Sequence, residues 1–178
     1  ASTAGETVRT DSHRLTDVPN ARVTFVEFLD FECEACGAAH PVMTDLREKY
    51  GKDVTFVVRY LPLHGNSMNA ALAAEAAREQ DKFEEMHDKL FETQAEWSHS
   101  ESSKEKTFEG YAQELGLDMK QYRASLKDPA AAQRIEQSKK DAQTLGVTGT
   151  PTFFLDGEKI EPTTIADFET KLDAAIED

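Results

Sequence analysis

Apolar and polar residues alternate along Arg22–Asp30, and this segment is rich in valine and phenylalanine. Such a pattern predicts a buried β-strand. Directly after it, apolar residues recur at helical spacing along Glu34–Tyr50, which predicts a helix, and a second strand is expected at Asp53–Tyr60. The polar residues before this unit, up to about Asp17, are expected to form a flexible arm.

The long middle part of the chain, Asn66–Leu145, has helical character throughout. It starts with an alanine-rich run of high helix propensity. Further along, five side chains share one helical face: Phe83, Met86, His87, Leu90 and Phe91. Apolar residues at this spacing predict core packing. Of the histidines in this region, His64 and His99 are expected at the surface or in loops.

The C-terminal segment combines strand and turn signals. A strand is expected at Thr152–Leu155, and Asp156-Gly157 after it is a strong hairpin signal that places the partner strand at Glu158–Ile160. A final helix is expected at Thr163–Ile176, with Thr163 as its N-cap.

The chain has two cysteines, Cys33 and Cys36, at the junction of the first strand and the first helix. Cys33 falls at or just before the first helical turn, where unpaired N–H groups and the helix dipole favour a thiolate. A thiolate is the attacking species in disulfide exchange, so this position predicts a nucleophile. Glu32 and Glu34 flank Cys33 and oppose its ionisation.

Two other interpretations of the cysteine pair are weaker. A closed structural zinc site usually has four cysteine or histidine ligands, and only His40 lies near enough in sequence to be a natural third ligand. A purely structural disulfide that closes so short a loop would stabilise the fold little. Redox chemistry is therefore favoured, and we expect no metal ion and no cofactor.

A second candidate element lies far along the chain, where Gly149, Thr150 and Pro151 precede the strand expected at Thr152. Proline tolerates a cis peptide bond at low cost, and a Thr-Pro step between a glycine and a strand is a natural place for one. An ordinary trans proline that opens a strand is the alternative.

Together these features resemble the DsbA-like branch of the thioredoxin superfamily, thiol-disulfide oxidoreductases of the bacterial cell envelope. The resemblance runs from about Asn20 to Ile176 and rests on four elements in order. These are Glu27 six residues before the first cysteine, the cysteine pair, Pro41 five residues after the second cysteine, and the run Gly149–Phe154.

The sequence departs from the family between the cysteines. Many relatives have proline after the first cysteine or histidine before the second, whereas this chain has Glu34 and Ala35. A histidine there helps make such proteins strong oxidants, so the resemblance alone leaves the oxidising strength open.

The resemblance implies an α/β fold, thioredoxin-like, with a helical insertion between the two halves of the core. We expect a flexible N-terminal arm at residues 1–19 and one DsbA-like domain at residues 20–178. Within this domain the core would comprise residues 20–64 and 147–178, and the insertion residues 65–146.

The resemblance also implies roles for the chemical groups. Cys33 would attack, and Cys36, one turn further into the helix, would resolve the mixed disulfide. Glu27 would lie on the central strand beneath the pair, where burial raises its pKa and suits it to proton exchange with Cys36. A solvent-facing Glu27 is the alternative, since its neighbours point to the opposite face.

Substrate binding is expected at two places. The backbone of Thr150 and Pro151 would pair with an extended substrate chain by strand addition. Glu34 and Ala35, between the cysteines, are expected to contact the same substrate.

The function expected from the resemblance is exchange of the Cys33–Cys36 disulfide with cysteines of extracytoplasmic proteins. We expect a dithiol oxidase of oxidative folding that acts on reduced or unfolded proteins and is reoxidised by a membrane thiol oxidase. A reductase or isomerase, or a non-enzymatic redox-regulated peptide-binding protein, is the alternative. Known isomerases of the superfamily carry a dimerisation module, and the residues before Arg22 are too few for one, so we expect a monomer.

Charge and composition limit the partners and the location. The net charge of −14 argues against nucleic acid or an anionic membrane surface as the main partner. No stretch approaches the roughly 20 apolar residues of a spanning helix, and Ala1–Thr10 lacks the apolar region of a signal peptide. We expect an extracytoplasmic protein, in the bacterial cell envelope or secreted, whose signal or anchor is absent from this chain.

Overall fold

A computed structural model describes residues 7–178. Its centre is a five-stranded sheet in the order β1-β3-β2-β4-β5. Strand β2 pairs in parallel with β3 and antiparallel with β4, and the two edge strands pair antiparallel with their neighbours. The strands are β1 (His13–Arg14), β2 (Val23–Leu29), β3 (Val54–Tyr60), β4 (Thr152–Leu155) and β5 (Glu158–Ile160).

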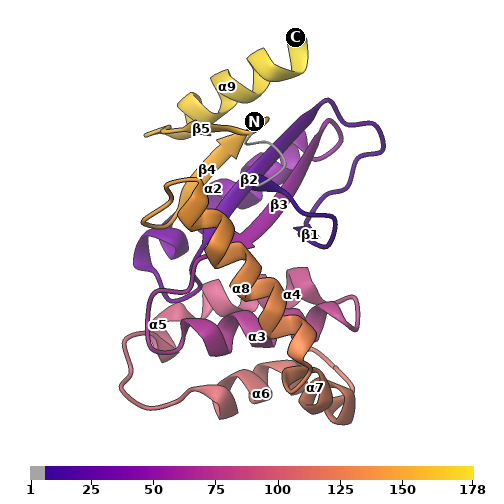
Figure 1. Ribbon diagram of the computed structural model, residues 1–178, viewed down its shortest axis with the longest axis vertical. Coiled ribbons are helices and arrows are strands. Elements are labelled where there is room, and N and C mark those ends of the chain that lie inside the picture. Colours follow the sequence, from indigo (N-terminus) through magenta and orange to yellow (C-terminus); the bar gives the residue numbers. More distant parts are fainter. Residues whose placement is uncertain (1–6) are drawn as a thin grey trace.

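The helices fall into two groups (Figure 1). Helices α2 (Glu34–Tyr50) and α9 (Ile165–Glu177) pack against the sheet, and α3 to α7 gather beyond its end. Helix α8 (Pro129–Thr144) runs from that group back to the sheet. The remaining helices are α3 (Ser67–Arg78), α4 (Phe83–Glu92), α5 (Gln94–Trp97), α6 (Glu105–Glu114) and α7 (Met119–Leu126). This arrangement matches the predicted insertion, and the residue boundaries of core and insertion stay a prediction.

Strand β2 is central, and helices cover it on both faces. Val23 and Phe25 pack in a cluster with residues of α2 and α9, whereas Val26 and Phe28 pack with the end of α8. Because side chains alternate along a strand, Glu27 points to the same face as Phe25. The structure therefore places this carboxyl on the face of the sheet that α2 covers.

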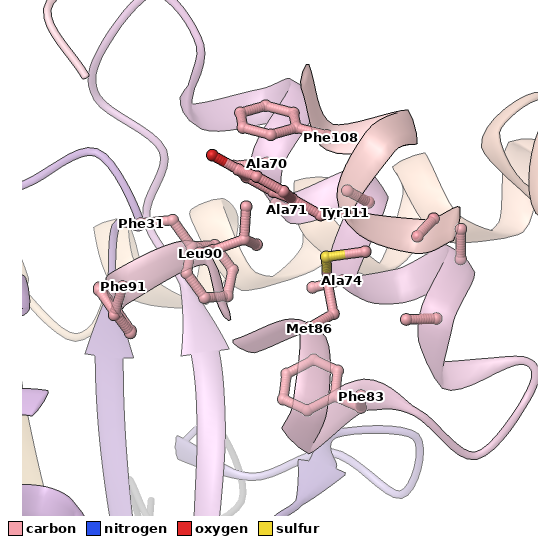
Figure 2. Packing of buried hydrophobic residues seen from close by; sticks show 14 of the residues in the cluster. Phe31, Ala70, Ala71, Ala74, Phe83, Met86, Leu90, Phe91, Phe108 and Tyr111 are labelled. Atoms are coloured by element: carbon pink, nitrogen blue, oxygen red, sulfur yellow. The ribbon is translucent and has the colours of Figure 1, made fainter. Parts of the chain in front are cut away.

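The insertion packs around an alanine-rich helix. Along α3, the small side chains of Ala70, Ala71 and Ala74 let α4 approach closely, and Figure 2 shows Leu90 and Met86 of α4 directed toward them. The same cluster contains Phe31, Phe91 and Cys36, which are also buried. The core of the insertion thus extends to the second cysteine without a break.

The N-terminal arm differs from its prediction where the structure describes it. Residues 7–17 lie against the sheet, because β1 pairs with β3 and the Leu15 N–H donates to the Phe56 carbonyl at 2.8 Å. The Arg9 guanidinium also contacts the Asp141 carboxylate of α8 at 2.6 Å. The first six residues of the predicted arm lie outside the described residues.

The N-cap predicted for the last helix is wrong by one residue. Thr164, not Thr163, caps α9, and its side chain accepts the Asp167 N–H. The Asp167 carboxylate in turn accepts the Thr164 N–H, which completes a capping box. Thr163 instead donates its hydroxyl and its N–H to the same carboxylate.

Among residues 7–178, no helix has both the length and the apolar character to cross a membrane.

Leu90 tests the packing of the insertion. It is 0% exposed, so Leu90→Ala should lower the free energy of unfolding by about 3 kcal/mol through lost burial and a residual cavity. Urea denaturation followed by circular dichroism measures this change. Leu63→Ala is the control, because Leu63 is 51% exposed and its loss should cost less than about 0.5 kcal/mol. Equal effects would contradict the packing described.

Candidate active site

Cys33 joins β2 to α2 as the N-cap of the helix. Its N–H donates to the Asp30 carbonyl at 3.0 Å, and its carbonyl accepts the Gly37 N–H at 3.0 Å. No side-chain hydrogen bond caps α2 at Cys33. The first N–H groups of the helix, at Ala35 and Cys36, therefore serve the Cys33 sulfur instead, and they help to lower its pKa.

The two thiols differ in burial and in acidity. Cys33 is half-buried and Cys36 is buried, and both are free thiols. The pKa of Cys33 is lowered to about 5, chiefly by a hydrogen bond from the Cys36 thiol and also by the Thr150 side chain, while partial burial opposes the shift. The same pairing raises the pKa of Cys36, together with its burial and the nearby Glu27. Cys33 is thus the thiolate of the pair.

Glu27 is buried at 8% exposure, on the β2 face that α2 covers. Burial raises the pKa of this carboxyl to about 8, although the charge of Arg47 opposes the shift. The charge of a Cys33 thiolate raises it further. A buried Glu27 excludes the solvent-facing alternative and leaves a group that can hold a proton near neutral pH beneath the pair.

The loop before β4 lies opposite the cysteines. The Thr150–Pro151 peptide bond is cis, and the Cys33 sulfur lies 3.5 Å from the Thr150 carbonyl oxygen, to which it donates when it is protonated. Glu34 and Ala35 follow Cys33 directly and are exposed at the start of α2. The residues that the sequence analysis predicts for catalysis and substrate binding thus lie together in the structure.

Gln94 is a residue of this site that no sequence pattern marks. It opens α5, and its Nε2 donates to the carbonyls of Phe31 and Cys33, both at 2.8 Å. Gly37 allows this approach, because a Cβ at that position would overlap the Gln94 Oε1 atom. The insertion therefore holds the active-site turn through two backbone carbonyls.

Glu32 does more than place charge beside Cys33. Its carboxylate is buried and accepts the N–H of Asn66 at 2.7 Å and the N–H of His99 at 2.9 Å. His99 Nε2 in turn lies 3.1 Å from the Glu34 carboxylate. His64 Nδ1 lies 2.7 Å from the Asp30 carboxylate. Both histidines are therefore neighbours of the active-site turn, which their sequence positions did not reveal.

One group within residues 7–178 has the composition of a metal site, and it contains neither cysteine. Ligand atoms of His40, His87 and Asp88 lie within 4.8 Å of one another. The Arg47 guanidinium lies 3.7 Å from the same Asp88 oxygen that His87 Nδ1 contacts at 2.9 Å. A cation already neutralises the carboxylate, so the cluster is an ion-pair network between α2 and α4.

The fold and the site match known proteins. A protein-family model described as Thioredoxin matches residues 13–174. A thioredoxin-like oxidoreductase from Silicibacter pomeroyi has a similar structure, with 30% identity, a TM-score of 0.80 and coverage of 96% of this chain and 95% of that one. The alpha-DsbA1 protein of Wolbachia pipientis shares the fold at 22% identity, with a TM-score of 0.84 and coverage of 99% and 96%.

A curated relative is a far longer protein. The Na⁺/H⁺ antiporter NhaA of Herminiimonas arsenicoxydans is 38% identical over 141 residues, which cover 79% of this chain and 22% of that protein. This chain therefore spans only a small part of the curated relatives that it matches.

The chain belongs to the thioredoxin family. Its fold is that of the DsbA-like proteins, with the cysteine pair at the start of α2 and a helical insertion. The predicted fold class and family are confirmed.

Glu27 should make the stability of the protein depend on pH. Its folded pKa of about 8 lies above the ordinary value of 4.5, so the unfolded chain loses this proton first as pH rises. The destabilisation is absent below pH 4.5, grows up to about pH 8 and is then constant.

Glu27→Gln should therefore stabilise the reduced protein by about 3 kcal/mol at neutral pH and by little in acid. Urea denaturation across this range measures the difference. Glu158→Gln, at an exposed position of β5, is the matched control and should change stability little. A gain for Glu27→Gln that does not vary with pH would refute the buried, proton-holding state.

Cys36 should control the acidity of Cys33. In the parent, the ultraviolet absorbance of the thiolate should titrate with a midpoint of about 5. Cys36→Ala removes the largest cause of the low pKa, so the midpoint should move upward toward the ordinary value for cysteine. A midpoint that stays fixed would show that the helix N–H groups suffice without the second thiol.

Proposed function

We propose that this protein is a dithiol oxidase, which passes the Cys33–Cys36 disulfide to reduced extracytoplasmic proteins. The observation that carries the proposal is the contrast between the two thiols, an accessible Cys33 with a pKa of about 5 beside a buried Cys36 with a raised pKa. A stabilised thiolate favours the reduced form of the couple and so makes its disulfide a stronger oxidant.

The chemistry is disulfide exchange in two steps. A substrate thiolate attacks the Cys33 sulfur of the disulfide, and Cys36 leaves with the electron pair of the S–S bond. A second substrate thiolate then attacks the substrate sulfur of the mixed disulfide and releases Cys33 as a thiolate. The substrate loses two electrons and gains its disulfide, and the protein becomes the dithiol.

The surrounding residues support both steps. In the dithiol the pairing with Cys33 is the largest cause of the raised pKa of Cys36, but burial raises it as well, so Cys36 is still basic when it leaves while Cys33 is in the mixed disulfide. Glu27 beneath the pair is the proton donor. An extended substrate would pair with the backbone of Thr150 and Pro151, next to the sulfur, and contact Glu34 and Ala35 at the exposed helix start. A catalytic cycle then requires reoxidation, which we assign to a membrane thiol oxidase.

The location and assembly follow from the same chemistry. Disulfides persist in oxidising compartments outside the cytoplasm, so we place the protein in the cell envelope or outside the cell. We propose that it acts as a monomer, because one chain supplies both cysteines, Glu27 and the loop at Thr150.

Two measurements separate this function from its alternatives. An oxidase should restore activity to a reduced protein that needs several disulfides, and its couple should be more oxidising than that of thioredoxin at about −270 mV. A couple at or below that value, with fast insulin reduction, would favour a reductase. Inactivity in both assays would favour a redox-regulated binding protein.

The order of the two cysteines can be tested with trapped intermediates. Cys36→Ala, incubated with a disulfide-containing protein, should accumulate a mixed disulfide through Cys33, because no second thiol can resolve it. Cys33→Ala should accumulate little, since Cys36 is buried and its pKa is raised. Non-reducing electrophoresis and mass spectrometry detect the adducts. Equal trapping by both variants would overturn the assignment.

A further inference from the structure

Asp30, a buried aspartate directly after strand β2, holds a histidine from another loop. The Asp30 side chain is 0% exposed, and one of its oxygens lies 2.7 Å from His64 Nδ1. The same carboxylate accepts the N–H of Glu32 and the N–H of Leu63, both at 3.0 Å. Because Asp30 also accepts the Cys33 N–H through its carbonyl, one residue ties the His64 ring to the active-site turn.

His64 remains accessible while it is held in this way. Its side chain is 39% exposed, so its ring can exchange protons with solvent. The His99 ring lies across from it at 6.0 Å between ring centroids, in an edge-on arrangement. His99 Nε2 is directed to the Glu34 carboxylate at 3.1 Å. Two histidines from different segments thus meet beside the first turn of α2.

We propose that His64, positioned by Asp30, is the cation that balances the Cys33 thiolate, and that the protonated fraction of His64 rises when the disulfide is reduced. This inference rests on the proposed role of Cys33. His64 lies in the loop after β3 and would supply the positive charge that a histidine between the cysteines provides in many relatives. This chain has Glu34 and Ala35 between its cysteines.

The negatively charged groups around His64 all favour its protonated form. Asp30, Glu32 and the Cys33 thiolate all raise the pKa of His64, with the hydrogen bond to Asp30 as the largest cause, and partial burial opposes them. The other neighbours are the His99 ring and, through it, the Glu34 carboxylate. Coupling between two sites is reciprocal, so a thiolate that favours protonated His64 is itself favoured by it.

The proton balance of the couple changes accordingly. Oxidation of a substrate dithiol yields two electrons and two protons. The electrons reduce the Cys33–Cys36 disulfide, one proton ends on Cys36, and Cys33 stays a thiolate. The remaining proton goes to solvent or to His64. His64 takes it up at a pH between the pKa that its ring has in the disulfide form and the higher pKa that it has in the dithiol form.

The parent protein provides the first test. The His64 ring pKa, followed by NMR, should be higher in the dithiol than in the disulfide form, by about half a unit to one unit for a charge near a protein surface. Reduced Cys33→Ala, which has no thiolate at this position, should give the value of the disulfide form. Equal His64 pKa values in the dithiol and disulfide forms would overturn the proposal.

The reciprocal test titrates Cys33 in His64→Gln. Loss of the cation should raise the Cys33 pKa by a similar amount, and added salt should shrink the difference. His13→Gln is the matched control, because His13 lies on β1 at the far edge of the sheet and should leave the Cys33 pKa unchanged. An unchanged Cys33 pKa in His64→Gln would refute the inference while the low parent pKa still supported the proposed function. A parent Cys33 pKa near the ordinary value would instead undermine the proposed function.

Discussion

The short turn between β2 and α2 fixes the position of the reactive sulfur, and most of the site is arranged around it. Its backbone is held from three directions, by the Asp30 carbonyl, by the Gly37 N–H and by the Gln94 side chain. A helix start has N–H groups without partners, and here they face a thiolate instead of a capping side chain. The acidity of Cys33 thus depends on the backbone geometry of a few residues.

Such a site collects negative charge, and the fold compensates each carboxylate differently. Asp30 accepts two backbone N–H groups and also contacts the His64 ring, whereas Glu32 is satisfied by two backbone N–H groups alone. Glu34, which is exposed, interacts with His99 across a solvated surface where ion pairs contribute little. The two acids predicted to oppose ionisation of Cys33 therefore have partners, and the pKa of that thiol is still lowered.

Much of the fold could be predicted from local sequence patterns, because the elements concerned are specified locally. Strand alternation gave β2 to within a residue at each end, and the helix Glu34–Tyr50 agrees with α2. The pairing of β1 with β3 could not be found in this way, since two residues in a polar segment carry no periodic signal. Thr163 and Thr164 are equally suitable caps by residue type, and only the position of Asp167 distinguishes them.

In the candidate site, too, features set by the local sequence could be predicted, whereas contacts between distant segments could not. Cys33 and Cys36 could be placed at the helix start because they directly follow the predicted strand, and Thr150 and Pro151 could be picked out because their local sequence is distinctive. Glu27 was placed beneath the pair only by the family resemblance, since strand parity left a solvent-facing position open. Contacts between segments distant in sequence were missed: Gln94 acts on backbone carbonyls, which any residue offers, and Asp30 and His64 are 34 residues apart. Neither contact leaves a pattern in one sequence.

The pKa values of the three buried or half-buried groups have an order that suits the proposed direction of proton movement. At neutral pH the Cys33 thiol, with a pKa of about 5, is ionised, whereas Glu27, with a pKa of about 8, keeps its proton. Cys36 has a raised pKa, so its thiolate, once released, is the stronger base. Transfer of the Glu27 proton to Cys36 is therefore downhill.

Arg47 does not prevent this storage of a proton on Glu27. Its guanidinium also lies near Glu84 and Asp88, at 3.8 and 3.7 Å, so its charge is shared with acids of α4. Burial then outweighs the attraction of Arg47 in setting the pKa of Glu27. The ion pairs between α2 and α4 thus leave the pKa of the carboxyl beneath the cysteines raised.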